Sequence, residues 1–579
     1  MFRSWLPILV VALSLFSANL YAQTTVNVEI SGIDKILEDN VRLYLSIEQQ
    51  KNHPLISDGR LARLHKKAAQ EISAALQPYG FYRSTINASL EKSTTGEWLA
   101  RYEIDPGPPL LITEFNFSIS REMGEDPEFR QLVEQDTLQS GNVFTHLEYE
   151  GFKANLAKLA SERGYFRAVF TVRRVEVDLE DYVARIYLDY DGGPRFRFGE
   201  IKLRQDVLRP EFLERFLPFG QGDAYSLDKL IELQQVLNDT NYFQTVEVSP
   251  GEPLPTSNEI PIEVSLTPRK ENRYEFGLGY GSDTGARTKF GWEKPRVNDR
   301  GHRFDSEIRI SEVGYNLGAN YRVPVLNPRT DQLVYSISEI NEEVEDVDSD
   351  LRAVGVSLNR SRGEWRETLA LDYEREDFEI GNDADKTSLL IPGITWSRTW
   401  GRNFIFVLDG LRFDFGLRGA DEGFGSDVEF GQASARLKFI SSLNRNNRFI
   451  ARGTIGSTTT PDFEKLPPSK RFFAGGSQSV RGYKYQSLGP EDESGDVIGA
   501  RRLLTGSIEF EHSLNDNWGI AVFYDVGNAV EDFDDELERG AGFGLRWKSP
   551  VGPVRIDAAS ALSDDGEPWR LHINIGPDL

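Results

Sequence analysis

The segment Phe276-Gly277-Leu278-Gly279-Tyr280-Gly281 places a large apolar side chain at every second position, with glycine between. Strict alternation with a period of two is typical of a β-strand whose two faces meet different surroundings. The same alternation recurs to the end of the chain, for example in Phe543-Gly544-Leu545-Arg546-Trp547. The second half of the sequence therefore predicts strands and almost no helix.

The alternating runs between Arg273 and Leu579 predict sixteen strands with one long insertion at about 461–500. They are 273–281, 286–295, 301–312, 314–324, 331–343, 351–362, 364–380, 386–400, 409–419, 428–443, 448–460, 501–514, 517–530, 540–549, 553–562 and 569–576. An even number of antiparallel strands can close into a barrel without an edge, and a closed barrel satisfies its backbone polar groups in lipid. We therefore expect residues 269–579 to form an antiparallel transmembrane β-barrel. A soluble β-sandwich would need large apolar side chains at its inward positions, whereas many of these are Gly, Arg, Asp or Asn.

The composition agrees with such a barrel despite a mean hydropathy of −0.43. A barrel strand shows lipid an apolar residue only at alternate positions, so its average hydropathy stays low. The 91 acidic and 66 basic residues give a charge of −25, which argues against a nucleic-acid partner. We interpret four acidic runs, 341–350, 377–385, 421–427 and 531–538, as solvated loops between strands.

The first half of the chain reads as one unit written three times. Each unit has an apolar strand, amphipathic helical stripes and two more strands, in the order β-α-α-β-β. A Gly or Asn followed by aromatic residues ends the last helix of each unit, starting at Gly80, Gly164 and Asn241. We interpret these aromatics as domain-core residues. The predicted domains are 23–107, 108–193 and 194–268.

The N-terminus has the pattern of an export signal. Arg3 precedes an apolar run from Trp5 to Phe16, and small and polar residues lead to Ala22. This order is typical of a cleaved signal peptide over residues 1–22, with Gln23 as the first mature residue. The alternative, a membrane anchor, is disfavoured because the run contains Pro7 and is shorter than the roughly 20 residues of a spanning helix.

A candidate site combines the long insertion with two later strands. Alternation turns Glu509 and Glu511 inward on one strand, and Phe523, Asp525 and Gly527 inward on the next. An arginine on an inward-folded loop could meet these carboxylates through its planar fork, with Phe523 stacked on the guanidinium. Arg481 in the insertion is the candidate, although from spacing alone it could equally be a solvated loop residue. The neighbouring Gly482 would allow a sharp turn or a close approach to the wall.

These residues carry a family resemblance. Val480-Arg481-Gly482-Tyr483 and Phe523-Tyr524-Asp525-Val526-Gly527 resemble signatures of the BamA/TamA superfamily of outer-membrane assembly and secretion proteins. The repeats resemble periplasmic POTRA domains, and three of them before sixteen strands are most similar to the TamA branch. The resemblance implies a location in the outer membrane of a Gram-negative bacterium, with residues 23–268 in the periplasm. It also implies that Arg481 anchors the loop through Asp525 and Phe523, with Glu509 as a further acidic partner.

The resemblance further implies a function without catalysis. The protein would insert or secrete clients such as autotransporters, meeting unfolded outer-membrane proteins, lipid and an inner-membrane-anchored TamB-like partner. Client strands would pass a weak seam between the first and last strands, where the candidate residues are Gly277, Gly279, Gly281, Ile573 and Ile575. The alternative is a passive channel or phospholipid conduit docked to a periplasm-spanning partner.

We expect no enzyme activity, no cofactor and no metal site. The six histidines stand at positions 53, 65, 146, 302, 512 and 572, without metal-ligand spacing, and the chain has no cysteine. The glycines of 277–281 superficially resemble a phosphate loop but lack the following helix and lysine.

Overall fold

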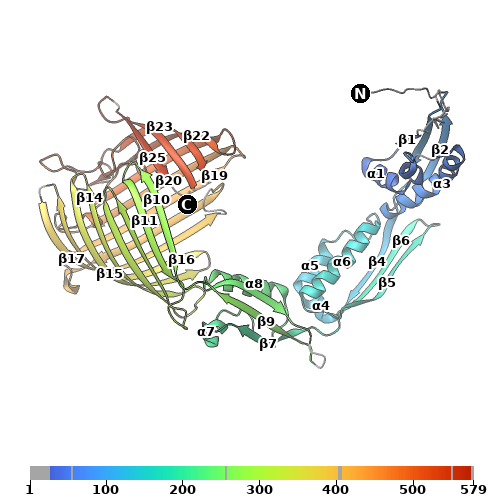
Figure 1. Ribbon diagram of the computed structural model, residues 1–579, viewed down its shortest axis with the longest axis horizontal. Helices are drawn as coiled ribbons and strands as arrows, with labels where there is room; N and C mark the ends of the chain where they lie inside the picture. Colours follow the sequence, from blue (N-terminus) through green and yellow to red (C-terminus); the bar gives the residue numbers. More distant parts are fainter. Residues whose placement is uncertain are drawn as a thin grey trace, which may run out of the picture. The chain divides into compact units, whose positions relative to one another are not determined.

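The computed structural model describes residues 26–575, apart from 54–55, 95, 254–256, 382, 402–406, 550–551 and 567. The predicted signal segment 1–22 lies outside the described residues. The chain divides into three α+β repeats and a β-barrel (Figure 1).

The first repeat packs helices on one face of a three-stranded sheet. Its elements are β1 (Val26–Ser31), α1 (Lys35–Tyr44), α2 (Ser46–Gln50), α3 (Asp58–Leu76), η1 (Gln77–Tyr79), β2 (Thr85–Lys92) and β3 (Trp98–Asp105). The sheet order is β1-β3-β2, with β1 parallel and β2 antiparallel to β3. Leu61 and Ile72 of α3 are fully buried together with Tyr102 of β3. Gly80 has a φ of +89°, the left-handed conformation with which the sequence pattern ends this helix.

The second and third repeats use the same topology, with sheet orders β4-β6-β5 and β7-β9-β8. The second comprises β4 (Leu111–Ile119), α4 (Arg121–Glu125), α5 (Pro127–Gln135), α6 (His146–Glu162), β5 (Val169–Asp178) and β6 (Val183–Asp191). The third comprises β7 (Arg197–Arg204), α7 (Pro210–Glu214), α8 (Leu227–Asp239), β8 (Phe243–Pro250) and β9 (Glu259–Pro268). Tyr165 and Tyr242, which follow Gly164 and Asn241, are 1% and 2% exposed, so both are core residues.

The remaining strands form one sixteen-stranded antiparallel sheet in which each strand pairs with the next along the chain, as predicted. They are β10 (Arg273–Gly281), β11 (Gly285–Lys294), β12 (Arg303–Ser311), β13 (Gly314–Pro324), β14 (Gln332–Val344), β15 (Val347–Arg362), β16 (Trp365–Ile380), β17 (Asp383–Gly401), β18 (Gly410–Ala420), β19 (Phe430–Ser442), β20 (Asn447–Thr459), β21 (Arg502–Ser513), β22 (Trp518–Val530), β23 (Glu538–Ser549), β24 (Gly552–Ala561) and β25 (Trp569–Ile575). The insertion between β20 and β21 contains one short helix, η3 (Pro468–Lys470). We call residues 461–500 the lumen loop.

The outer face of the sheet is apolar. On β10, the side chains of Tyr274, Phe276 and Leu278 are 66%, 70% and 77% exposed. Such exposure of large apolar side chains is expected where lipid rather than water surrounds them. Within the described residues, no helix is both long enough and apolar enough to cross a membrane.

The prediction that the acidic runs 341–350 and 377–385 form loops is wrong. β14 continues to Val344 and β15 starts at Val347, while β16 continues to Ile380 and β17 starts at Asp383. Outside the bilayer both faces of a strand meet water, so a polar segment can remain paired. Asp377 there forms an ion pair of 2.7 Å with Lys386 on the neighbouring strand. The runs 421–427 and 531–538 do lie between strands, except that Glu538 begins β23.

Candidate functional site in the barrel lumen

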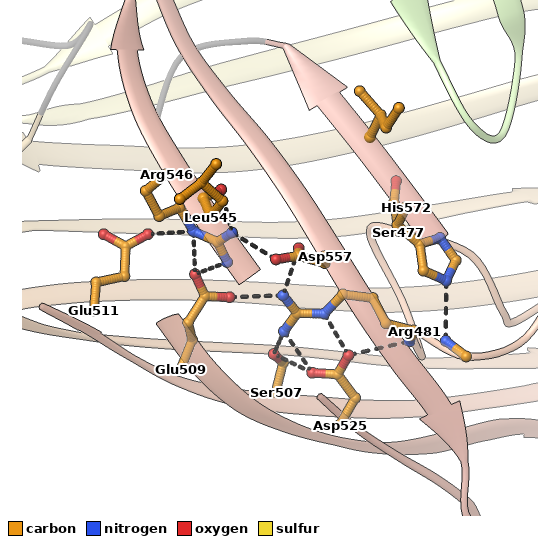
Figure 2. A network of polar contacts seen from close by, with 12 residues as sticks. Ser477, Arg481, Ser507, Glu509, Glu511, Asp525, Leu545, Arg546, Asp557 and His572 are labelled. Carbon is orange, nitrogen blue, oxygen red and sulfur yellow. Dashed lines mark hydrogen bonds and ion pairs between the residues drawn. The ribbon is translucent and has the colours of Figure 1, made fainter. Parts of the chain in front are cut away.

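Arg481 of the lumen loop is 2% exposed and binds several acidic groups of the barrel wall (Figure 2). Its Nε and Nη2 donate to the two oxygens of Asp525 at 2.7 and 2.9 Å, and its backbone N–H donates to Asp525 at 3.1 Å. Its Nη1 donates to Glu509 at 2.7 Å and to Asp557 at 3.1 Å. The guanidinium carbon lies 3.4 Å from the centre of the Phe523 ring. The arginine is thus held at its edge by carboxylates and on its face by an aromatic ring.

Two further arginines pair with the acidic groups of the wall. Arg546 of β23 donates to Glu509 at 2.6 Å, to Glu511 at 2.9 Å and to Asp557 at 2.5 Å. Arg448 of β20 donates to the other oxygen of Glu511 at 2.5 Å. Buried charges are costly unless they are paired and hydrogen-bonded, and this chain of alternating charges meets both conditions. We call this cluster of Arg448, Arg481, Ser507, Glu509, Glu511, Asp525, Arg546 and Asp557 the charged cage.

The other residues of the 480–483 motif fasten the loop to the wall. Val480 is fully buried in an apolar cluster with Ala529 and Ala561 of the barrel strands. Gly482 has a φ of +103°, and a Cβ there would lie 2.8 Å from the backbone nitrogen of Ala561. The hydroxyl of Tyr483 donates to Glu538 at 3.1 Å. Only glycine fits this close approach between loop and wall.

The structure brings three of the four predicted wall residues to Arg481. Glu509, Phe523 and Asp525 contact it, whereas Gly527 packs against β21, where a Cβ would lie 2.5 Å from the carbonyl oxygen of Leu504. Sequence reasoning missed Asp557 and Arg546. The period of two along β23 and β24 could have placed both side chains inward, because each alternates with apolar neighbours.

A second polar cluster, also missed, holds the beginning of the lumen loop to a different part of the wall. Lys470, 2% exposed, forms an ion pair with Glu374 of β16. Glu376, two residues further on the same inward face, accepts hydrogen bonds from Ser349 at 2.8 Å and from the backbone N–H of Ser469 at 3.2 Å. The loop is therefore anchored at two separated regions of the barrel interior.

The predicted seam residues lie on the two ends of the sheet. Gly277, Gly279 and Gly281 are on β10, and Ile573 and Ile575 are on β25. Among the described residues, the hydrogen bonds between these edges gather at one point just beyond β10. There the Ser282 N–H donates to the Ile573 carbonyl, and the Ile573 N–H donates to Ser282 Oγ, both at 3.2 Å. In the part of the chain that the structure describes, which ends at Ile575, no strand ladder joins β10 to β25.

Comparison with known protein families shows the superfamily to which this chain belongs. Residues 256–578 match the Omp85 superfamily domain. The chain belongs to the Omp85 superfamily. Within this Omp85-superfamily chain, residues 27–106 match a model described as POTRA domain TamA domain 1. Residues 196–269 match a POTRA model described as a surface antigen variable number repeat.

Individual relatives of this Omp85-superfamily chain are outer membrane protein assembly factors named BamA. The protein from Nitratidesulfovibrio vulgaris is 22% identical over 94% of this chain and 71% of its own length. The protein from Neorickettsia risticii is also 22% identical, over 77% of this chain and 63% of its own length. The crystal structure of Haemophilus ducreyi BamA lacking POTRA domains 1–3 superposes with a TM-score of 0.67 at 19% identity. That comparison covers 81% of this chain and 99% of the other, and it supports the fold.

The Omp85 fold defines the location of the chain. The barrel lies in the outer membrane, and the POTRA repeats lie in the periplasm. The lumen loop with its charged cage is therefore inside a membrane-spanning wall, and the seam between β10 and β25 faces the bilayer.

Proposed function

We propose that this protein is an assembly and translocation factor that inserts or secretes outer-membrane clients, such as autotransporters, through its seam. We further propose that it is the TamA-like subunit of a two-protein module, with an inner-membrane-anchored TamB-like partner bound by its periplasmic repeats. This function requires the binding of clients and movement of the barrel wall, and it requires no catalytic chemistry. The POTRA match over residues 27–106 and the three repeats support the TamA-like assignment.

The proposal rests on the difference in strand pairing between the seam and the rest of the barrel wall. On the far side of the barrel, β15 and β16 pair over sixteen residues each, and so do β16 and β17. At the seam, counted over the described residues to Ile575, β10 has nine residues and β25 has seven, and the hydrogen bonds described between the two edges gather at Ser282 and Ile573. Because each backbone hydrogen bond contributes about 0.5–1.5 kcal/mol, separating the seam costs far less than separating any complete ladder. The unpaired backbone of both edges could then bind a client strand by strand addition.

The contents of the lumen fit a moving wall better than a selective pore. A selective pore lines its constriction with charges that meet the passing solute. Here the charges of the cage bind one another and the loop, so Arg481 and its carboxylates are occupied in fixing the loop against β21, β22 and β24. We infer from this arrangement that the loop stabilises the strands next to the seam.

Locking the seam tests the proposed route. The chain has no cysteine, so Ser282→Cys with Ile573→Cys introduces the only two thiols. We expect oxidation to block insertion of a client barrel into the outer membrane or into vesicles, and reduction to restore it. The matched control is Val356→Cys with Leu371→Cys, a pair in register on the fully laddered β15 and β16. Full client insertion with the seam oxidised would refute the route and favour a passive conduit.

Capture of the partner tests the second part of the proposal. Full-length protein cross-linked in cells should recover an inner-membrane-anchored protein. Deletion of residues 27–106 should abolish this recovery if the first repeat binds the partner, while the barrel remains in the outer membrane. Equal recovery after the deletion would exclude the first repeat as the docking site.

A further inference from the structure

His572 of the last strand contacts the lumen loop rather than a neighbouring strand. Its side chain points inward and the residue is 2% exposed. Its Nε2 accepts a hydrogen bond of 3.0 Å from the backbone N–H of Gly482 (Figure 2). The last strand is thereby joined directly to the 480–483 motif. The charged cage does not account for this contact, because it holds the loop to β21, β22 and β24.

Asp283 makes the matching contact from the other edge of the seam. It lies in the turn between β10 and β11, and its side chain is 14% exposed. One carboxylate oxygen accepts the backbone N–H of Ser477 at 2.9 Å and the Ser477 hydroxyl at 2.6 Å. Ser477 is five positions before Gly482 in the same loop. A short piece of one loop thus binds both edges of the seam.

The two edges also meet each other at this place. The Nδ1 of His572 lies 3.7 Å from the other oxygen of Asp283, beside the backbone contacts of Ser282 and Ile573. These side-chain contacts join the two edges directly beside the backbone hydrogen bonds of Ser282 and Ile573.

We propose that Asp283 and His572 are positioning residues that fasten loop residues 477–482 across the seam, so that the loop clasps the first hairpin to the last strand. This proposal rests on the proposed function, because the clasp affects clients only if clients pass through the seam. The contacts themselves belong to the resting molecule.

The hydrogen bond to the loop sets the tautomer of the imidazole. Because Nε2 accepts the Gly482 N–H, the ring proton is on Nδ1, facing Asp283. The ring therefore presents its acceptor to the loop and its N–H to the first hairpin.

Asp283 is ionised at neutral pH. Burial alone would raise the pKa of this carboxyl, but the contacts with His572 and Ser477 outweigh burial and hold the pKa at about 2. Other charged groups of the loop and the wall line the same small cavity as His572. They are Lys438, Arg452, Arg481, Glu509, Arg555 and Asp557. A variant that changes only the imidazole separates His572 from all of these.

Distance measurements with spin labels test the clasp directly. The absence of native cysteine allows two label pairs, Thr284 with Asp565 across the seam and Gln478 with Asp565 between the loop and the β24–β25 turn. In the wild type we expect one short distance for each pair.

Three substitutions complete the test. His572→Gln keeps an acceptor for Gly482, so its loop distance should stay short. His572→Phe should lose the short loop distance, and Asp283→Ala should broaden both distances. An unchanged loop distance in His572→Phe, or a loop distance lost equally in His572→Gln and His572→Phe, would overturn the clasp. His572→Gln preserves size and polarity and is the matched control, and Asp283→Ala tests the clasp independently from the other edge.

Client insertion measured on the same samples separates the two proposals. Distances that change as expected while insertion is unaffected would establish the clasp and refute use of the seam by clients. Unchanged distances would overturn the clasp whatever the insertion rate.

Discussion

Replacing Arg481 with alanine should free the lumen loop while leaving the barrel closed. The substitution removes the hydrogen bonds to Asp525, Glu509 and Asp557 and the stacking on Phe523, and it leaves carboxylates that are at most 7% exposed without this partner. Breaking a buried ion pair by removing one member costs about 3–5 kcal/mol. Arg546 still neutralises part of the charge, so we expect the lower end of that range. A cost of about 3 kcal/mol raises the undocked population of the loop by roughly 10²-fold.

Limited proteolysis of the loop measures this population. When opening and closing are fast, the rate of cleavage follows the fraction of open molecules. Cleavage within 461–500 should therefore accelerate by roughly two orders of magnitude in Arg481→Ala. Arg481→Lys should fall between the variant and the wild type, because lysine keeps the charge but not the planar fork.

The matched control is Lys484→Ala in the same loop. Lys484 pairs with Glu345, but the two side chains are 51% and 46% exposed. An exposed pair of this kind contributes at most about 1 kcal/mol, so cleavage should change by less than roughly fivefold. Heat-modifiable migration on a gel shows that each barrel has folded. Wild-type cleavage kinetics in a folded Arg481→Ala protein would refute the anchoring role of the cage.

Three further predictions concern other contacts. Glu376→Gln should destabilise the docked start of the loop by about 1–3 kcal/mol, because an amide replaces a carboxylate that accepts hydrogen bonds from Ser349 and Ser469. Faster proteolytic cleavage near Lys470 would show this loss, and an unchanged cleavage rate would contradict it. Asp126→Ala should destabilise the second repeat by about 2–4 kcal/mol, since it removes the N-cap of α5 and the hydrogen bonds from Arg163. Amide hydrogen exchange in α5 and α6 of the full chain should become faster, and an unchanged exchange rate would refute the prediction. The contact of Ser477 with Asp283 should persist from neutral pH down to about pH 4 and fail only as the pH falls through about 2, because a lowered carboxyl pKa stabilises the docked loop above that value. Cleavage of the wild-type loop by an acid-stable protease measures that dependence, and a transition near pH 5 would contradict it.

The sequence was sufficient for those parts of the fold that depend on local periodicity. Alternation placed the strands within a few residues and turned Glu509 and Asp525 inward, because the direction of a side chain in a strand depends only on its position. It failed for the acidic runs around Glu345 and Gly381, since a polar segment outside the bilayer can be loop or paired strand with equal ease.

Contacts that depend on the course of a long loop could not be predicted. Ser477 binds Asp283 from a distance of 194 positions in sequence, and Gly482 binds His572 across 90. Alternation states which wall residues face the lumen, but not where an irregular segment of about forty residues will cross it. His572 was accordingly noted only as a scattered histidine without metal-ligand spacing.

Three of the contacts that fasten the loop, those of Gly482, Ser477 and Arg481, differ in strength, and the difference implies an order of release. The neutral bond between Gly482 and His572 contributes about 0.5–1.5 kcal/mol, and bonds to the charged Asp283 about 1.5–3 kcal/mol. The cage around Arg481, at about 3 kcal/mol or more, is the strongest. A client that adds its strand to the edge of the seam would therefore displace the contacts at β25 and at the first hairpin before those of the cage. The loop would leave the seam while Arg481 still holds it to β21, β22 and β24, so the closed wall can re-form without the loop having to find its place again.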